Sequence, residues 1–364
     1  MSTLRVNLKQ IVDNSYDIKI GKDLFEDFIS GLKENPIAYS YVIVTDSNVR
    51  KLYGEKLKSL IDGIAEKTLL IDFPAGEMQK TREIKTEIED RMLEAGFGRD
   101  SALIALGGGV VGDIAGYVAA TYTRGIPYIQ VPTTLVACVD SSIGGKTAVD
   151  TPHGKNLIGS FYQPEAVIID INTLTTLGPE EIREGLAEII KYGIIADYEL
   201  FELIEQKSDD IFNYNIELLS LIVEKCCRIK GDVVENDERE SNLRKILNFG
   251  HTIGHAIENN SNYTLTHGNS ISIGMVLEGQ IAVNLGILST EDLERVRLVF
   301  IAAGLPVEIP FDIDPEKLIS SMKIDKKSRA GVIEMSLPEA IGKIYSIDGK
   351  YSLKIDDETI REVF

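Results

Sequence analysis

The chain has 364 residues, 44% of them hydrophobic and 26% charged, and its 38 basic and 57 acidic residues give a formal net charge of -19. This composition is typical of a soluble globular protein, and the length favours two domains over one. The charge argues against nucleic acid or an anionic membrane as a partner, because phosphate groups would be repelled. A small anionic substrate in a local basic pocket remains possible.

Targeting and redox signals are also absent from the sequence. No run of about 18 uncharged apolar residues occurs, so we expect no membrane span. The start, MSTLRVNLKQ, lacks the apolar core of a signal peptide. Cys138, Cys226 and Cys227 fit no disulfide framework or cysteine-based zinc motif. We therefore expect a cytoplasmic protein with small, buried, reduced cysteines.

The first half of the chain alternates short apolar runs with helical patterns such as residues 80–96. The apolar runs are rich in β-branched residues and bounded by turn residues, which predicts buried strands. These runs are 41–46, 68–73, 102–109, 128–134 and 166–170. Alternation of this kind predicts a Rossmann-like, doubly wound, mostly parallel sheet.

The pattern changes after Gly178, where helical periodicity dominates. Long helices are predicted over 178–195, 215–234, 246–258, 271–286 and 289–304. Residues 334–338 and 345–355 predict a small hairpin with a turn at Asp348-Gly349. We expect an α/β domain over residues 1–178, a mainly helical domain over 179–364, and the active site in the cleft between them.

Two glycine-rich segments suggest anion binding. Gly107, Gly109 and Gly112 fit G-x-G-x-x-G between a strand and a helix, which suits a pyrophosphate. The acidic residue expected about 20 positions later is missing, so a plain tight turn is an equal alternative. Within residues 140–150, Gly145-Lys146-Thr147 matches the end of a P-loop motif. The first glycine of that motif is missing, because Asp140 occupies its position. A nucleotide-hydrolysing P-loop is therefore rejected, although glycine amides beside Lys146 still suit an anion.

Three of the four histidines lie close together, at His251, His255 and His267. His251 and His255 share a helix face, which suits a divalent metal or proton transfer. A catalytic zinc usually takes three protein ligands, so two histidines would need a carboxylate. Glu188 is a candidate because it shares a helix face with Lys191. The alternative is an exposed face of paired charges.

Basic residues form a second candidate set. Lys230 falls within the apolar stripe of its helix, so it either snorkels or reaches an internal anion. The other members of the set are Arg124, Lys146, Lys155, Lys191 and Arg244, with Asn248 as a further donor. Together with a metal, they suggest a small substrate that carries a carboxylate or a phosphate.

These residues also carry a family resemblance. Residues 107–164, from GGGVVGD through SSIGGKTAVD to SFYQP, resemble the central signature of dehydroquinate synthases. GLAEIIKYG, LNFGHTIGHAIE, LTHGNSISIGM and Asp325-Lys326-Lys327 match this family in the same order. The resemblance spans the whole chain. It implies a homodimeric lyase that converts 3-deoxy-D-arabino-heptulosonate 7-phosphate to 3-dehydroquinate and phosphate, the second step of the shikimate pathway, with catalytic NAD and one zinc or cobalt ion.

The resemblance also implies roles for individual residues. The metal ligands would be Glu188, His251 and His267, and His255 would act in proton relay or substrate contact. The substrate-contacting positions would be Arg124, Lys146, Asn156, Lys191, Lys230, Arg244, Asn248 and Lys326. For the last of these, Lys327 is an alternative phosphate contact.

The implied NAD contacts lie mostly in the first half. They are Asp46, Asn48, Glu77, Lys80, Gly108, Gly109, Val110, Asp113, Thr133, Thr134, Asp140, Lys146, Lys155, Thr173 and Thr176. Ala75 departs from the acidic residue usual in this family, which puts one NAD contact in doubt.

Three alternatives to dehydroquinate synthesis stay open. The closest is a sister sugar-phosphate cyclase, against which the intact segments GGKTAVD and HGKNLIG argue. The second is a metal-dependent polyol dehydrogenase of related fold, which would release NADH in net amounts. The third is an inactive nucleotide-binding module. Such a module would be expected to have lost one or more of Glu188, Lys191, His251 and His267, all of which are present.

Overall fold

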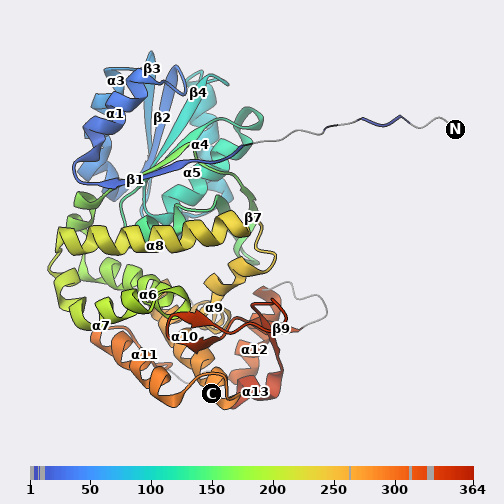
Figure 1. Cartoon of the computed structure of the whole chain (residues 1–364). Helices are drawn as coiled ribbons and strands as arrows, with labels where there is room; N and C mark the ends of the chain where they lie inside the picture. The colour runs from blue at the N-terminus through green and yellow to red at the C-terminus, as the bar shows by residue number, and fades with distance from the viewer. Residues whose placement is uncertain (1–3, 7, 9–12, 262–263, 311–313, 326–331) are drawn as a thin grey trace.

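The computed structural model describes residues 4–6, 8, 13–261, 264–310, 314–325 and 332–364. A sheet with flanking helices forms the upper part of the molecule in Figure 1, and a mainly helical part lies below it. The long helix α8 (Ile216–Asn236) runs across the middle, between the two parts. None of the helices in the described ranges is both long and apolar enough to cross a membrane.

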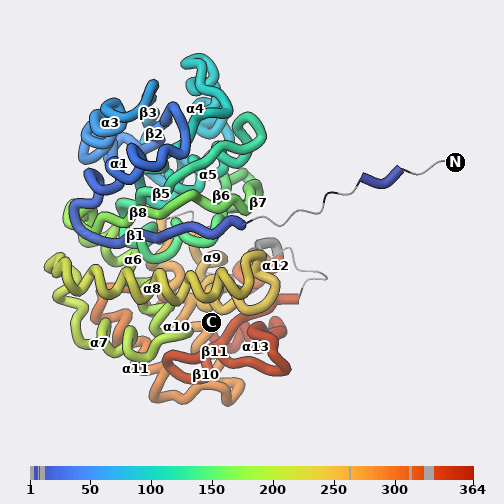
Figure 2. The backbone as a smooth tube through the Cα atoms, turned by 45° about the horizontal axis from the view of Figure 1, so that its top comes forward, coloured from blue at the N-terminus to red at the C-terminus, as the bar shows by residue number. Residues whose placement is uncertain are grey.

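The sheet has six parallel strands in the order β1-β8-β5-β4-β2-β3. Their bounds are β1 Asp17–Gly21, β2 Ser40–Asp46, β3 Lys67–Phe73, β4 Ser101–Gly107, β5 Tyr128–Pro132 and β8 Ala166–Asp170. The five predicted apolar runs form β2, β3, β4, β5 and β8, and the predicted parallel sheet is confirmed. The edge strand β1, which lies beside β8 above α8 in Figure 2, was not predicted.

Helices cover both faces of this sheet because successive side chains of each strand point to opposite faces. Val42 and Val44 of β2 pack with α4 (Arg82–Glu94) and α5 (Gly109–Thr121). Tyr41 and Ile43 pack with α1 (Leu24–Glu34) and α3 (Glu55–Asp62) on the other face. The strands are apolar on both faces, as expected for a parallel sheet buried between helix layers.

The helical part comprises α6 Pro179–Ala196, α7 Tyr198–Phe212, α8, α9 His251–Asn260, α10 His267–Asn284, α11 Thr290–Ala302, α12 Pro315–Asp325 and α13 Asp357–Arg361. The helices α7, α12 and α13 were not predicted. Val167 of β8, Leu186 of α6 and Ile222 of α8 belong to one continuous apolar core. This shared core fixes α6 and α8 against the sheet. The division of the chain at residue 178 stays a prediction.

Short elements complete the chain. They are α2 Ser47–Val49, the turns of helix η1 Arg50–Gly54, η2 Glu77–Gln79, η3 Tyr122–Arg124, η4 Ala137–Ser141, η5 Ile171–Thr176 and η6 Leu243–Asn248, and the strands β6 Lys146–Thr151, β7 Gly154–Phe161, β9 Ile333–Met335, β10 Pro338–Ala340, β11 Lys343–Ile344 and β12 Leu353–Ile355. The antiparallel hairpin β6–β7 was not predicted.

Two turns decide questions left by the sequence. A strand, β6, follows Gly144 and Gly145, whereas a P-loop requires a helix there, so its rejection is confirmed. Near the end of the chain, β9 pairs with β12, and Ile347 bridges Lys350 across the predicted turn. Asp348 and Gly349 have φ values of 51° and 72°, the left-handed pair that a tight two-residue hairpin turn needs.

Candidate active site

Helix α6 carries Glu188 and Lys191 into the interior of the molecule. Pro179 occupies the first turn of α6, a position that favours proline. The buried residues of α6 lie all around the helix rather than along one stripe. Glu188 and Lys191 are each 1% exposed, and their side chains form an ion pair one helical turn apart. The alternative of an exposed, charged helix face is therefore wrong.

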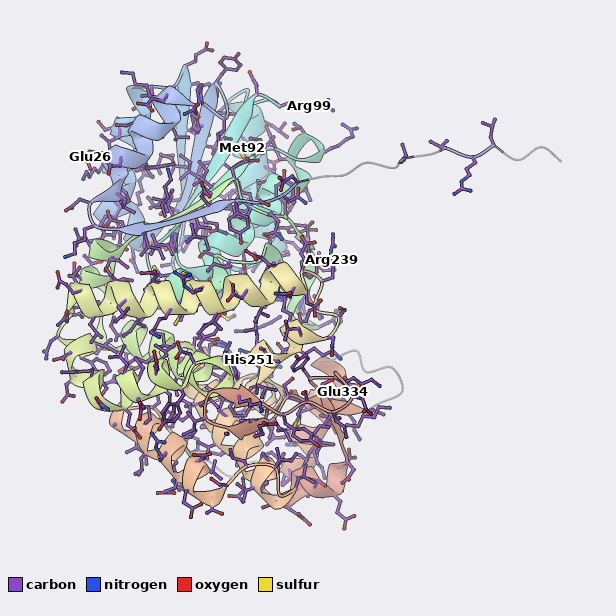
Figure 3. The ribbon with its side chains drawn as sticks, viewed as in Figure 1. Glu26, Met92, Arg99, Arg239, His251 and Glu334 are labelled. Atoms are coloured by element: carbon purple, nitrogen blue, oxygen red, sulfur yellow. The ribbon has the colours of Figure 1, made fainter. Side chains whose placement is uncertain are left out.

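Two histidine nitrogens converge on this carboxylate. Glu188 Oε1 lies 3.4 Å from His251 Nε2 and 3.1 Å from His267 Nε2. The three ligand atoms all lie within 4.8 Å of one another. The other nitrogen of His251 lies 3.1 Å from the carbonyl oxygen of Phe249, which orients the ring. Two imidazoles and one carboxylate at this separation suit a catalytic divalent metal. Figure 3 shows His251 below α8, in the interior of the molecule.

The charges around this cluster shift its pKa values strongly. Burial opposes the ionisation of Glu188, but Lys191 and His251 hold the pKa of its carboxyl well below the usual range. Burial, together with Lys191, lowers the pKa of His251 to about 4. Despite burial, the hydrogen bond to Glu188 and the nearby carboxylate of Glu258 raise the pKa of His267 to about 10. In the metal-free protein, the ionised Glu188 is thus neutralised by Lys191 and a protonated His267.

The third histidine, His255, lies beside the cluster. Its ring centroid is 5.2 Å from that of His251 and 5.9 Å from that of His267. His255, Glu258 and His267 also form a group of ligand-type atoms within 4.8 Å of one another. The geometry thus offers two possible ligand sets that share His267.

A second network centres on Asp140, in η4 of the sheet half, where the Asp140 side chain is 22% exposed. Lys230 Nζ from α8 lies 2.9 Å from Asp140 Oδ1 and donates to the backbone oxygen of Asp140 at 2.8 Å. The Tyr192 hydroxyl from α6 donates to Asp140 Oδ1 at 2.5 Å. Although burial opposes it, Lys230 and then Lys191 lower the pKa of Asp140 to about 2. Of the two alternatives left open for Lys230, the structure shows that it reaches an internal anion.

Three more of the predicted substrate-contacting residues, Lys146, Arg244 and Asn248, lie in η6 or pair with a residue beside it. Arg244 is 1% exposed, and its Nη2 donates to the backbone oxygen of Gly144 at 3.1 Å. Glu240 forms an ion pair with Lys146, and its other oxygen accepts from Asn248 Nδ2 at 2.5 Å. Glu240 thus occupies two groups that are predicted to contact the substrate.

Not every predicted substrate contact joins these networks. Arg124 is exposed after α5 with a φ of 75°, and no hydrogen bond or ion pair within the described ranges ties it to the histidine cluster. Asn156 is exposed on β7, where its backbone N–H donates to Asp150 Oδ1 at 2.8 Å. Lys326 and Lys327 lie outside the described residues.

The glycine turn after β4 has the features of a phosphate-binding helix start. Gly108 precedes α5 with extended backbone, and no described side chain caps this helix. A Cβ on Gly108 would lie 2.9 Å from Thr134 Cγ2, so the side chain of a larger residue at this position would crowd Thr134. Val110 lies in the first turn of α5. Lys80 Nζ lies 2.5 Å from Asp113 Oδ2 on the next turn. Backbone N–H groups at the helix start, with a buried cation nearby, suit a pyrophosphate.

The other predicted NAD contacts differ in how far local bonds engage them. Asp46 Oδ1 caps α2 by accepting from the backbone N–H groups of Asn48 and Val49 at 2.8 and 3.0 Å. The Thr173 hydroxyl donates to the backbone oxygen of Asp170, and that of Thr176 lies 2.8 Å from the Tyr53 hydroxyl. These bonds order the loops that border β2 and β8. The Thr133 hydroxyl is buried and has no hydrogen-bond partner within the described part of the chain.

Sequence reasoning missed several residues of these networks. Tyr192, Glu240 and Glu258 were not among the predicted site residues, although each bonds to one that was. Glu258 follows His255 by three positions, so it lies on the same face of α9. That spacing was the available signal. An acidic residue on a helix is ordinarily solvated, so the signal alone would not have been decisive.

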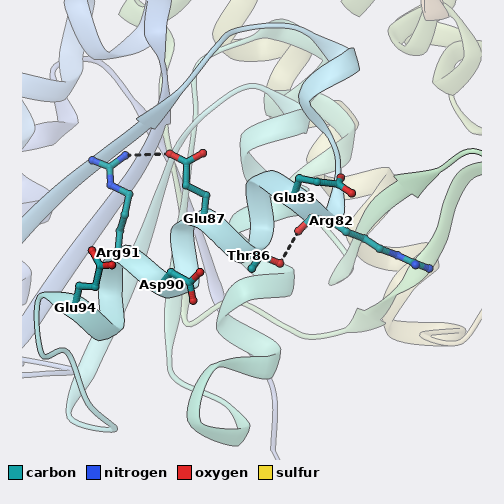
Figure 4. Close-up of a pocket in the computed structure, with 7 residues that line it drawn as sticks. All are labelled: Arg82, Glu83, Thr86, Glu87, Asp90, Arg91 and Glu94. Carbon is teal, nitrogen blue, oxygen red and sulfur yellow. Dashed lines mark hydrogen bonds and ion pairs between the residues drawn. The ribbon is translucent and has the colours of Figure 1, made fainter.

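A surface hollow lies away from this cluster, along the outer side of α4. Figure 4 shows its lining residues, which are Arg82, Glu83, Thr86, Glu87, Asp90, Arg91 and Glu94. All belong to one helix, and Arg91 pairs with Glu87 across one turn. Such an exposed pair contributes little to stability, and the hollow brings together no residues from different elements.

Comparison with known proteins agrees with this architecture. The fold matches the solved structure of 2-deoxy-scyllo-inosose synthase complexed with carbaglucose-6-phosphate, NAD+ and Co2+, with a TM-score of 0.87 and 28% identity over 95% of each chain. It also matches 2-epi-5-epi-valiolone synthase from Streptomyces hygroscopicus subsp. jinggangensis with NAD+ and Zn2+ bound, with a TM-score of 0.88 and 29% identity over 99% of this chain and 98% of that one. The fold and the cluster therefore define the class of sugar-phosphate cyclases.

Sequence comparison identifies the family within this class. Residues 70–184 match 3-dehydroquinate synthase N-terminal and residues 185–328 match 3-dehydroquinate synthase C-terminal. A 3-dehydroquinate synthase from Desulforamulus reducens is 44% identical over 345 residues, which cover 94% of this chain and 95% of that protein. The chain belongs to the 3-dehydroquinate synthase family.

Proposed function

We propose that this protein converts 3-deoxy-D-arabino-heptulosonate 7-phosphate to 3-dehydroquinate and phosphate, a carbon–oxygen lyase reaction. The observation that carries the proposal is the placement of Glu188 Oε1 between His251 Nε2 and His267 Nε2, at 3.4 and 3.1 Å. Family membership over most of the chain supports the same substrate.

The residues present fit one divalent metal, zinc or cobalt, and NAD. For the metal, the donor set is one carboxylate and two imidazoles, with Glu188, His251 and His267 as ligands. For NAD, the uncapped start of α5 and the close approach of Gly108 to Thr134 support a pyrophosphate site. When bound, the metal would polarise oxygen atoms of the substrate and NAD would supply reversible hydride transfer, without net redox change.

The chain's own residues would position charge and move protons. Lys146, Lys230 and Arg244 would bind the anionic groups of the substrate and hold it in a reactive geometry. Lys191 would keep Glu188 ionised, because the two side chains are paired in the interior. His255 would transfer the proton during phosphate elimination, since it lies beside the ligand cluster. Ring opening and intramolecular aldol closure would complete the carbocycle.

One assay tests the activity. The purified protein is supplied with the heptulosonate phosphate, zinc or cobalt, and a catalytic amount of NAD. Phosphate release, absorbance at 340 nm and product identity are then followed together. We expect phosphate release and dehydroquinate without NADH build-up. Lasting NADH accumulation would indicate a polyol dehydrogenase, and a different carbocycle would indicate a sister cyclase. No phosphate release would overturn the proposal.

Two further expectations are not needed for this chemistry. The homodimer and the cytoplasmic location, both predicted from the sequence, stay predictions. A direct mass measurement in solution would test the first, because a dimer would have twice the chain mass of 40.2 kDa.

A further inference from the structure

Glu278 lies in the middle of α10 and bonds to the start of a different helix. Its side chain is fully buried, at 0% exposure. Its Oε2 accepts from the backbone N–H of Gly250 at 2.8 Å, and its Oε1 accepts from that of Ile253 at 3.0 Å. Gly250 immediately precedes α9, which begins at His251, and Ile253 lies in the first turn of this helix.

Helix α9 depends on this carboxylate because its own sequence supplies no cap. Gly250 precedes the helix with a φ of 78°, and glycine has no side chain to accept a hydrogen bond. The first N–H groups of a helix have no partner within the helix, and the helix start carries a partial positive charge. Glu278 satisfies two of these N–H groups and places a negative charge at the favourable end of α9.

The two helices are also in direct backbone contact, which limits sliding. A Cβ on Gly274 of α10 would lie 2.0 Å from the backbone oxygen of Gly250. A Cβ on Gly250 would lie 2.1 Å from Met275 Cγ. No side chain separates the helices here, so a small shift of α9 along α10 would cause a clash or break the bonds to Glu278.

The position of α9 relative to α10 matters for the cluster. His251 is the first residue of α9 and His267 is the first of α10. Their Nε2 atoms approach the same oxygen of Glu188. A displacement of about 1 Å is enough to loosen such a site.

We propose that Glu278 is a positioning residue that holds α9 so that His251 and His255 face Glu188 and His267. This role rests on the proposed metal site, and Glu278 itself touches neither metal nor substrate. It acts through the two backbone bonds at the start of α9.

The test compares Glu278→Gln with Asp170→Asn. Asp170 is a matched control, because it is a carboxylate with 5% exposure that accepts from the backbone N–H groups of Asp23 and Leu24, at the start of α1. Both variants should unfold at a lower temperature than the parent protein. Co2+ affinity and the visible spectrum of bound Co2+ are then measured below the unfolding temperature.

We expect Glu278→Gln to bind Co2+ about tenfold more weakly or worse, with a changed visible spectrum. Asp170→Asn should stay within about twofold of the parent protein in affinity, with an unchanged spectrum. Equal affinities and identical spectra in the parent and Glu278→Gln proteins would overturn the role of Glu278. Failure of the parent protein to bind Co2+ would overturn the metal site of the proposed function instead.

A second variant covers the case in which Glu278→Gln does not fold. Glu278→Asp keeps the charge but is shorter by one methylene, so it can satisfy at most one N–H without moving α9. We expect an intermediate loss of Co2+ affinity. If neither Glu278 variant folds while Asp170→Asn does, Glu278 is needed for the folding of the whole protein. The proposed role in positioning α9 is then wrong.

Discussion

Lys155 Nζ lies 2.7 Å from Glu258 Oε1, and this ion pair joins the sheet half of the chain to the helix that carries two of the histidines. The other oxygen of Glu258 lies 3.7 Å from His267 Nδ1. Lys155 also lies 3.1 Å from Glu77 Oε1, at the predicted NAD side. A continuous line of charges therefore runs from that side to a predicted metal ligand.

Replacement of Glu258 should weaken metal binding although Glu258 is not a proposed ligand. A carboxylate that faces the outer nitrogen of a ligating histidine, as Glu258 faces His267 Nδ1 at 3.7 Å, helps to orient the ring and raises its basicity. We expect Glu258→Gln to lower zinc affinity by about 10- to 100-fold, measured by competition with a chromophoric chelator. Glu334→Gln is the control. Glu334 is also a carboxylate in an ion pair, and its Oε2 lies 2.9 Å from Lys245 Nζ. An unchanged zinc affinity in Glu258→Gln would contradict the arrangement.

Metal binding at pH 7 should release about one proton. The pKa of His267 is raised to about 10 in the metal-free protein, so its proton must leave before Nε2 can bind a metal. The pKa of His251 is lowered to about 4, and that of Glu188 lies well below its usual range, so neither holds a proton at pH 7. Apparent affinity should therefore rise about tenfold per pH unit between pH 5 and 9.

Calorimetric titration of zinc at pH 7 measures this release. Two buffers with different ionisation enthalpies are compared, and the difference in observed heat gives the number of protons. If zinc binding released almost no protons from the parent protein, His267 would already be neutral in the metal-free protein. Glu258 would then not stabilise the protonated form of His267.

Local sequence patterns were sufficient to predict five of the six strands of the sheet. The five apolar runs form strands because each is β-branched and buried on both faces, which few other arrangements allow. The edge strand β1 was not predicted, because its sequence DIKIG is short and two of its positions are exposed. The hairpin β6–β7 was not predicted, because its glycine-rich segments resemble anion-binding loops more than strands.

Local sequence patterns predicted the type of site, whereas the pairing of Glu188 with His251 and His267 came only from the family resemblance. Helical spacing placed His251 beside His255, and Lys230 within an apolar stripe, because these relationships are local. The meeting of Glu188 with His267, 79 positions apart, depends on the packing of α6 against α10. No single-sequence pattern encodes that contact. The buried acids Glu258 and Glu278 were missed for the same reason, since their partners lie on other helices or at another helix's first turn.

The two possible ligand sets that share His267 can be separated by removing one histidine at a time. We expect His251→Ala to abolish stoichiometric zinc binding, because His251 belongs to the proposed set. His255→Ala should retain zinc but lose at least about 100-fold in kcat, as expected for loss of proton transfer. Metal content by elemental analysis and steady-state kinetics measure the two effects. Stoichiometric zinc in His251→Ala, with loss of zinc in His255→Ala, would assign the metal to His255, Glu258 and His267 instead.

The effects of replacing Asp140 and Lys230 on stability should be non-additive. Lys230→Met leaves the Asp140 carboxylate, whose side chain is 22% exposed, without its nearest cation. This costs about 3 kcal/mol in free energy of unfolding, at the low end for a buried ion pair because water reaches Asp140. The double variant Asp140→Asn with Lys230→Met removes both charges, so its loss should be smaller than the sum of the single losses. Urea unfolding of the three variants at pH 7 gives the coupling.

The same pair should contribute to the loss of stability at acid pH. The pKa of Asp140 is lowered from 3.8 to about 2 in the folded protein, so its contribution is fully present above pH 3.8. That contribution is lost as the pH falls from 3.8 to about 2, because the unfolded carboxyl takes up its proton first. It amounts to about 2 kcal/mol, by the equivalence of one pKa unit to about 1.4 kcal/mol. Asp140→Asn lacks this titration, so its unfolding free energy should fall less steeply between pH 4 and 2 than that of the parent protein. Parallel curves for the two proteins in this range would show that Lys230 does not stabilise the ionised form of Asp140.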